Sequence, residues 1–146
     1  MRSKLLEIAL GTILLTAAAA SAGTVSLTHA SFRMISPDVP GAAYFDLRNL
    51  EDRPVILTGA RSASCGAMMF HLSSTEGGMA RMREADPLVL QPGEAISFKP
   101  GGYHIMCMDP SAALMTARTV TVRLEFKNHP PIETAFTVTD AFGRPH

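Results

Sequence analysis

The 146-residue sequence has no tryptophan, only two cysteines and no excess of charge of either sign, since 13 basic side chains balance 13 acidic ones. Lys and Arg are scattered singly, so the chain lacks the basic surface with which proteins bind phosphate backbones, and it has no acidic run that would form a solvated tail. We therefore expect no nucleic-acid partner. The 47% hydrophobic and 18% charged content is that of a packed globule, and the length fits one domain.

Long apolar runs are also absent, except for one at the start of the chain. Arg2 and Lys4 precede an apolar segment over residues 5–20, and Ala20-Ser21-Ala22 forms a small-x-small cleavage site. This layout is typical of a secretory signal peptide. The apolar part is shorter than the ~20 residues that a membrane span needs. We expect residues 1–22 to be a signal peptide and residues 23–146 to form one periplasmic domain without stable membrane insertion.

Helical periodicity is almost absent after the signal, because apolar residues recur at every second position. This period predicts half-buried strands, and turn segments that contain Gly or Pro separate several of them. The strands are expected at residues 24–29, 42–48, 55–61, 67–72, 79–84, 94–98, 103–108, 119–126 and 132–138, with room for a helical turn only at 111–118. Eight to nine short strands at this spacing predict an all-β fold, either an antiparallel β-sandwich or a Greek-key barrel.

Methionine is abundant, with nine residues, and several lie beside two histidines. Met is often core filler, and Met68 and Met79 are read that way. In a strand over 103–108, however, His104, Met106 and Met108 share one face. Met69 and His71 share a face of the strand over 67–72, and a hairpin at Gly77-Gly78 can return Met82 to the same place.

Imidazole and thioether together suit Cu(I), whereas carboxylates suit Mg²⁺ or Ca²⁺ and thiolate sets suit zinc or iron–sulfur clusters. A thioether has no proton to lose, so metal affinity would depend on pH only through the two histidines. It is also a weaker ligand than thiolate. A mixed site could therefore hold copper and still let a partner displace its ligands one at a time, as a carrier requires.

The spacing of these residues resembles the signature of the periplasmic copper chaperone family called PCuAC. His71 is followed by ten residues and Met82, then by twenty-one residues and His104, with Met106 two positions further on. The segments Ala43-Tyr44-Phe45-Asp46-Leu47-Arg48-Asn49 and Pro100-Gly101-Gly102-Tyr103-His104-Ile105-Met106 also look like the family's early strand and its ligand-bearing strand. The resemblance covers residues 25–138.

The resemblance implies a cupredoxin-like β-sandwich that binds one Cu(I) per chain through His71, Met82, His104 and Met106. It implies a copper chaperone that delivers the metal to the copper centre of a cytochrome c oxidase subunit or to a thioredoxin-like assembly factor. We expect the chain to be a monomer. The chain departs from the common family pattern in carrying Cys65 and Cys107. Whether Met69, Met108 or His29 assists copper binding stays open.

The two cysteines are expected to form a disulfide, because an exported chain with two cysteines meets an oxidising compartment. The bridge between Cys65 and Cys107 would tie together the two strands that carry the histidines. The alternative is that Cys107 is a reactive thiol, since a β-bulge would turn it toward the ligands.

Other functions remain as alternatives. A blue-copper electron-transfer protein would need Cys107 as a thiolate ligand, yet a regular strand points it away from His104 and Met106. A β-sandwich interaction module without metal would leave the clustered ligands unexplained. An enzyme is not expected, because no nucleophile motif or His/Asp pair stands out. His29 and His129 are expected to be solvated, and His146 to be a mobile terminal residue.

Overall fold

Alternating apolar and polar residues form ten strands in the computed structural model, which describes residues 24–146. The expected signal peptide lies outside the described residues. The strands are β1 (Val25–Arg33), β2 (Gly41–Asn49), β3 (Val55–Arg61), β4 (Ala67–Glu76), β5 (Met79–Glu84), β6 (Leu88–Leu90), β7 (Ala95–Phe98), β8 (Tyr103–Met108), β9 (Thr119–Phe126) and β10 (Ile132–Thr139), with one 3₁₀ turn, η1, at Ala112–Met115. Within this part of the chain no helix has the length and apolar character to cross a bilayer.

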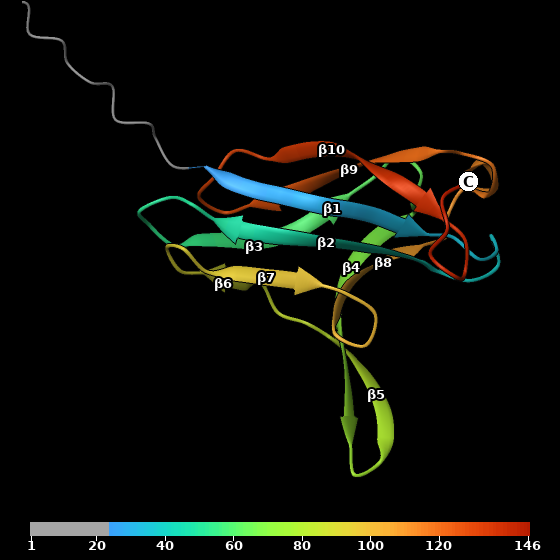
Figure 1. Cartoon of the computed structure of the whole chain (residues 1–146), viewed down its shortest axis with the longest axis horizontal. Coiled ribbons are helices and arrows are strands. Elements are labelled where there is room, and N and C mark those ends of the chain that lie inside the picture. The colour runs from blue at the N-terminus through green and yellow to red at the C-terminus, as the bar shows by residue number, and fades with distance from the viewer. Residues whose placement is uncertain (1–23) are drawn as a thin grey trace, which may run out of the picture.

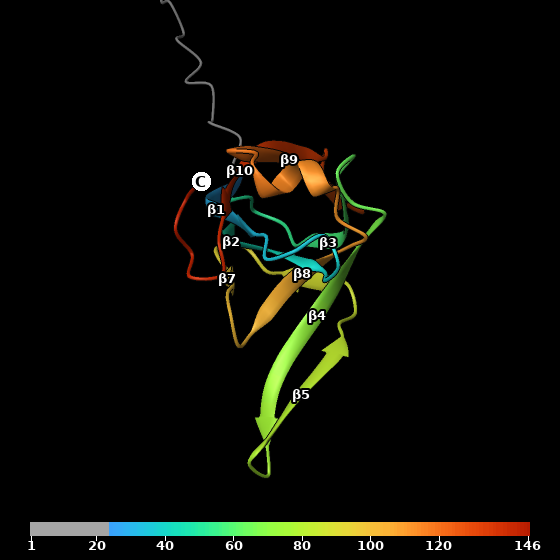
Figure 2. The same ribbon diagram turned by 90° about the vertical axis from the view of Figure 1, so that its right-hand side faces the viewer.

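Hydrogen bonds join the ten strands into one sheet in the order β5-β4-β8-β7-β2-β1-β10-β9-β3-β6, and β8 also pairs with β2. The sheet curls so that β9 and β10 lie across the interior from β2 and β7 (Figures 1 and 2). The all-β fold expected from the alternation is thus confirmed. Two features differ from the expectation: the pairings of β1 with β10 and of β7 with β8 are parallel, and β6 is an additional short strand.

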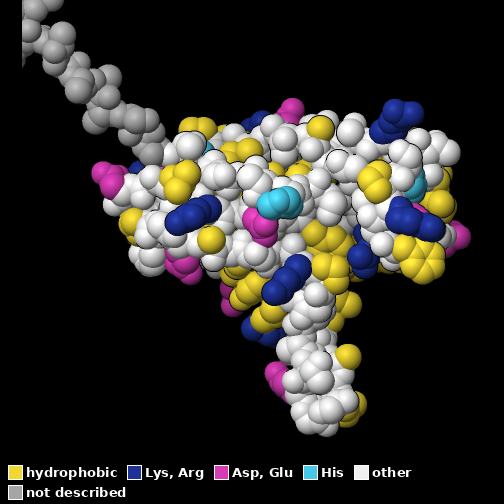
Figure 3. Space-filling model, in the orientation of Figure 1, with side chains coloured by type: hydrophobic (Ala, Val, Ile, Leu, Met, Phe, Trp, Pro, Cys, Tyr) yellow, Lys and Arg dark blue, Asp and Glu magenta, His cyan; other side chains and the backbone are white. Residues whose placement is uncertain are grey.

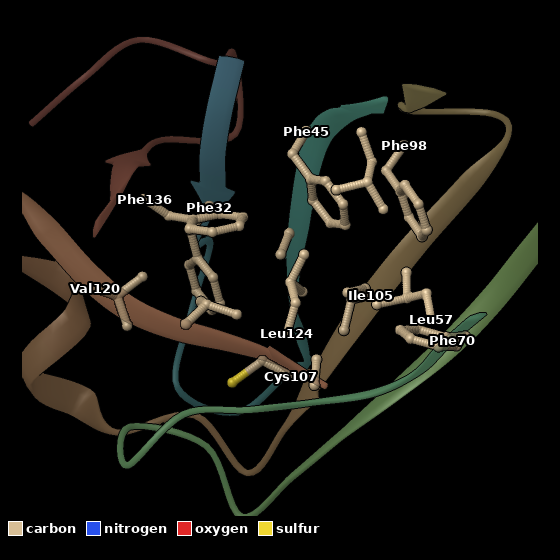
Figure 4. Close-up of a cluster of buried hydrophobic side chains, with 14 of the residues drawn as sticks. Phe32, Phe45, Leu57, Phe70, Phe98, Ile105, Cys107, Val120, Leu124 and Phe136 are labelled. Carbon is tan, nitrogen blue, oxygen red and sulfur yellow. The ribbon is translucent and has the colours of Figure 1, made fainter. Parts of the chain in front are cut away.

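The core lies inside the curled sheet and is built around phenylalanine rings (Figure 4). Phe45 of β2 stacks on Phe98 of β7 with ring centroids 4.3 Å apart, and it meets Phe136 of β10 edge-on at 5.7 Å. Such aromatic pairs contribute ~0.5–1.5 kcal/mol each beyond their buried area. The contact with Phe136 holds β2, which runs beside β8, against the opposite side of the sheet, and the stack on Phe98 joins β2 to the neighbouring β7.

The hairpin of β4 and β5 projects from this body (Figures 1 and 2). Glu76 pairs with Met79 across the two-residue turn Gly77-Gly78, whose φ angles are 58° and 77°. Two consecutive residues with positive φ are what a type I′ turn requires, and glycine adopts them without a steric penalty. The turn therefore fixes the register of β5 against β4, and with it the position of Met82.

Candidate metal centre

His71 and His104 are direct neighbours across β4 and β8. They are paired in the antiparallel register, and their ring centroids lie 5.8 Å apart. Directly paired residues point to the same face of a sheet, with Cβ atoms ~4.5–5.5 Å apart. The adjacent residues Phe70 and Ile105 are buried in the core. Because side chains alternate between faces, the two imidazoles point to the other side of the sheet.

Met82 reaches the same place from β5. It pairs with Ser73, which lies two residues beyond His71 on β4, and so it projects from the same face. Its sulfur is 3.2 Å from Nε2 of His104. The sequence expectation that the Gly77-Gly78 hairpin would return Met82 to the histidines therefore agrees with the geometry.

The contact between His104 and Met82 joins two groups that both carry lone pairs. Nδ1 of His104 lies 3.0 Å from the carbonyl oxygen of Gly102. A carbonyl can only accept, and this contact therefore assigns the proton of the neutral ring to Nδ1 and leaves a lone pair on Nε2. Metal bonds of ~2.0 Å to nitrogen and ~2.3 Å to sulfur place two ligands about 3.5 Å apart at the tetrahedral angle. The observed gap is close to that spacing.

His71 also has a ring nitrogen without a hydrogen-bond partner among the described residues. Nδ1 of His71 is buried and makes no hydrogen bond with any of residues 24–146. Leaving a buried polar atom unpaired costs about 1–3 kcal/mol. A metal ion bound to this nitrogen would remove that cost, so the donor set fits a soft cation.

Met106 completes the predicted set on the outer face of β8. It lines a hollow of about 260 Å³ together with Met82 and His104. The described residues contain no group of three His, Cys, Asp or Glu side chains placed to share a metal ion. Any metal centre of the type expected here therefore depends on the thioethers.

Cys107 lies on the opposite face of β8 from the candidate ligands. It is fully buried and bonded to Cys65, with Cα atoms 5.4 Å apart. Its pairing with Met68 follows the regular register of β4 and β8, without a bulge that would turn it toward His104. The disulfide is thus present, and it removes the thiolate that a blue-copper site or a reactive thiol would need.

Two residues of the hollow were not identified from the sequence as part of the site. The guanidinium of Arg33 lies 5.3 Å from the ring centre of Tyr44, and both residues line the hollow with Met106. Burial raises the pKa of the Tyr44 hydroxyl, and the nearby Arg33 opposes that rise. Alternation predicts that both side chains point out of the core, but the hollow forms only because β1, β2 and β8 are neighbours.

The other histidines lie apart from this group. His29 is exposed and hydrogen-bonds Asp46 at 2.8 Å. The expectation that His129 is solvated was wrong, because its side chain is 11% exposed, lies 3.3 Å from Glu51 and packs edge-on against Phe126 at 5.2 Å. Both histidines are thus engaged by carboxylates.

Comparison with known families matches residues 15–138 to the family described as "Putative lipoprotein LpqE-like". The protein Lxx21020 of Leifsonia xyli subsp. xyli is 31% identical over 103 residues, which are 70% of this chain and 62% of the relative. Protein RP573 of Rickettsia prowazekii is 31% identical over 74 residues, or 50% of this chain and 41% of the relative. The matches thus span less than two thirds of each relative's length.

Solved structures of similar fold include copper-binding domains. The copper-bound PCuAC domain of PmoF2 aligns with a TM-score of 0.66 at 22% identity, covering 83% of this chain and 97% of that domain. The solution structure of CuI-DR1885 from Deinococcus radiodurans aligns with a TM-score of 0.61 at 26% identity, covering 87% of this chain and 84% of that protein. The β fold expected from the resemblance to PCuAC is therefore confirmed.

Proposed function

Since the chain belongs to the LpqE-like family and has the fold of PCuAC domains, we propose that it is an extracytoplasmic carrier that binds one Cu(I) and passes it to another protein. The ligands are His71, Met82, His104 and Met106. The observation that carries the proposal is the contact of 3.2 Å between Nε2 of His104 and the sulfur of Met82, in which neither atom has a proton to share. His71 stands directly opposite with an unpaired ring nitrogen.

Cu(I) suits this donor set better than the other biological metals. All four donors are neutral when the imidazoles are unprotonated, and thioether sulfur is a soft ligand that selects Cu(I). Zn²⁺ sites use thiolate, imidazole or carboxylate ligands, and Ca²⁺ and Mg²⁺ sites use oxygen. The copper in the solved relatives PmoF2 and CuI-DR1885 supports the choice.

The position of Met82 suits transfer to a partner. Its side chain is 57% exposed, and all of β5 is exposed along the projecting hairpin. Hydrophobic side chains gather at the root of this hairpin (Figure 3). An acceptor can therefore displace the Met82 sulfur first, while the buried His104 still holds the ion. Cu(I) then leaves by ligand exchange, without a change of oxidation state.

The acceptor is a copper-binding protein of the same compartment, either a cytochrome c oxidase subunit or a thioredoxin-like assembly factor. This assignment rests on the PCuAC resemblance, and the periplasmic location rests on the cationic and apolar start of the sequence and on the lipoprotein description of the family. The carrier acts as a monomer. It performs no chemical step beyond ligand exchange.

Anaerobic titration with Cu(I) against a coloured chelator tests the proposal. The parent should take up one equivalent, and Met106→Leu should bind it more weakly while keeping the fold, because a swap of similar volume costs under ~1.5 kcal/mol. Loaded protein is then mixed with the soluble, metal-free copper domain of the oxidase subunit, whose metal content is measured after separation. A parent that binds no Cu(I), or a Met106→Leu variant that binds it as tightly, refutes the site. Failure of transfer to every candidate acceptor refutes the assigned partners alone.

A further inference from the structure

The outer face of β4 and β8 carries two more thioethers than the four-residue site uses. Met69 pairs directly with Met106, and Met108 lies two residues further along β8, opposite Ala67. Because residues two apart in a strand share a face, these three methionines form a cluster next to His104, which we call the thioether cluster. It consists of Met69, Met106 and Met108.

Core packing does not account for this cluster. Met68, the neighbour of Met69 in sequence, points inward and packs against the buried residues, whereas none of the three cluster members belongs to the core or packs against it. Each is half-buried. Cross-strand partners have Cβ atoms ~4.5–5.5 Å apart, and diagonal neighbours at ~7–8 Å remain within reach of long side chains. Three sulfur atoms can therefore converge on one ion.

Two residues that stand beside the cluster have short side chains. Ala67 stands opposite Met108, and Ala42 of β2 stands beside Met106. Neither methyl side chain is long enough to cover an adjacent thioether. Met106 also lines the hollow together with Met82 and His104, so it belongs both to the cluster and to the proposed His/Met site.

We propose that Met69, Met106 and Met108 form a second, weaker Cu(I) position that shares Met106 with the His/Met site. Three neutral thioethers select a soft monovalent ion, and they lack the stronger imidazole ligands. The inference rests on the proposed Cu(I) site and adds a path to it. Copper moves from the cluster to the main site when its bonds to Met69 and Met108 break and bonds to His71, Met82 and His104 form. The bond to Met106 is kept throughout, and the charge on the metal does not change.

The test uses the mature chain with ¹³C-labelled methionine methyl groups and Cu(I) as the probe, under anaerobic conditions. In the double variant His71→Ala/Met82→Leu, which lacks two ligands of the main site, the methyl signals of Met69 and Met108 should both shift on addition of Cu(I). Replacing those two residues with Leu should weaken the residual binding about tenfold or more, or ~1.4 kcal/mol. The matched control is Met68→Leu, because that side chain faces the core; it should leave the residual binding unchanged.

If the double variant does not fold, a second measurement on the parent tests the cluster. In the parent, Cu(I) added beyond one equivalent should shift the Met69 and Met108 methyl signals in fast exchange. If the parent binds the first equivalent tightly but neither methyl signal moves, in the parent with excess Cu(I) or in the folded double variant, the cluster is refuted and the main site stands. Absence of tight binding in the parent refutes the proposed function instead, so the two failures are distinguishable.

Discussion

The sharpest perturbation compares two methionines on the projecting hairpin, Met82 and Met79. They are 57% and 63% exposed and lie on the same strand, β5. Met82 shares the face of Ser73 and the histidines, whereas Met79 pairs with Glu76 on the opposite face. Both can be changed to Leu with little loss of packing. The pair therefore separates a proposed ligand from an exposed apolar side chain on the same element.

The magnitude follows from the exposure of the two side chains and from the metal contact proposed for Met82. A volume-conserving swap costs under ~1.5 kcal/mol even in a core, and two side chains more than half exposed should cost less. Loss of a group that only supports a metal ligand already lowers affinity about 10–100-fold. Met82→Leu removes a sulfur 3.2 Å from Nε2 of His104, and we therefore expect its Cu(I) dissociation constant to rise at least about tenfold, or ~1.4 kcal/mol.

Chelator competition at fixed pH and salt measures both dissociation constants, and urea unfolding of the metal-free proteins checks that stability is unchanged. Met79→Leu should bind Cu(I) as the parent does. Equal affinity of Met82→Leu and the parent would refute the role of the hairpin as a ligand-bearing arm. A parallel loss in Met79→Leu would mean that the hairpin acts through its overall conformation and not through one sulfur atom.

Three further predictions concern the framework. Replacing Cys65 and Cys107 with Ser opens a loop with a sequence separation of 42, and thermal and urea unfolding should show a loss of up to ~3–4 kcal/mol by the chain-entropy argument. Gly41→Ala should cost ~1–3 kcal/mol in urea unfolding, as overpacking does, because the new Cβ would lie 2.7 Å from the fully buried ring of Phe32. The pKa of Asp46 is lowered, chiefly by the hydrogen bond from Ser97 and then by that with His29. The ionised carboxylate therefore stabilises the fold above the ordinary carboxyl pKa, and this stabilisation is lost as pH falls through the lowered value. Asp46→Asn should lower the free energy of unfolding at pH 6 and make it fall less steeply at acid pH.

Two of the framework predictions have a companion variant. Gly59→Ala meets no atom within 4 Å and has no positive φ, so it should leave stability nearly unchanged. Ser97→Ala removes the hydrogen bond of 2.6 Å to Asp46. Like Asp46→Asn, it should make the free energy of unfolding fall less steeply at acid pH. A cysteine-free variant as stable as the parent, a harmless Gly41→Ala, or an unchanged acid profile would contradict the respective account.

The faces of the site strands could be predicted from sequence, because they depend only on local alternation. His104 and Met106 lie on the opposite face of β8 from Ile105 and Cys107, as expected. Ile105 and Cys107 are fully buried and Met106 and Met108 only partly, whereas His104 is buried on the outer face. The turn at Gly77-Gly78 was also readable, since consecutive glycines favour a two-residue hairpin. Local geometry was thus sufficient for the orientation of each candidate ligand.

Pairing between distant strands could not be predicted. That His71 stands opposite His104 depends on the register of β4 and β8, which is set by the whole curled sheet. The alternation also fails at the bulge between Thr28 and Ser31, where His29 has φ 54°, and β1 therefore extends beyond its predicted end to Arg33. The contact of His129 with Phe126 likewise depends on how the segment after β9 folds back.

X-ray absorption of the Cu(I)-loaded mature protein tests the central claim most directly. The account predicts one copper per chain in the monovalent state, surrounded by nitrogen from His71 and His104 and by sulfur from Met82 and Met106. Met82→Leu should lose sulfur scattering while Met79→Leu retains it. Copper bound only by nitrogen or oxygen, or a parent and a Met82→Leu variant with identical sulfur shells, would contradict the account.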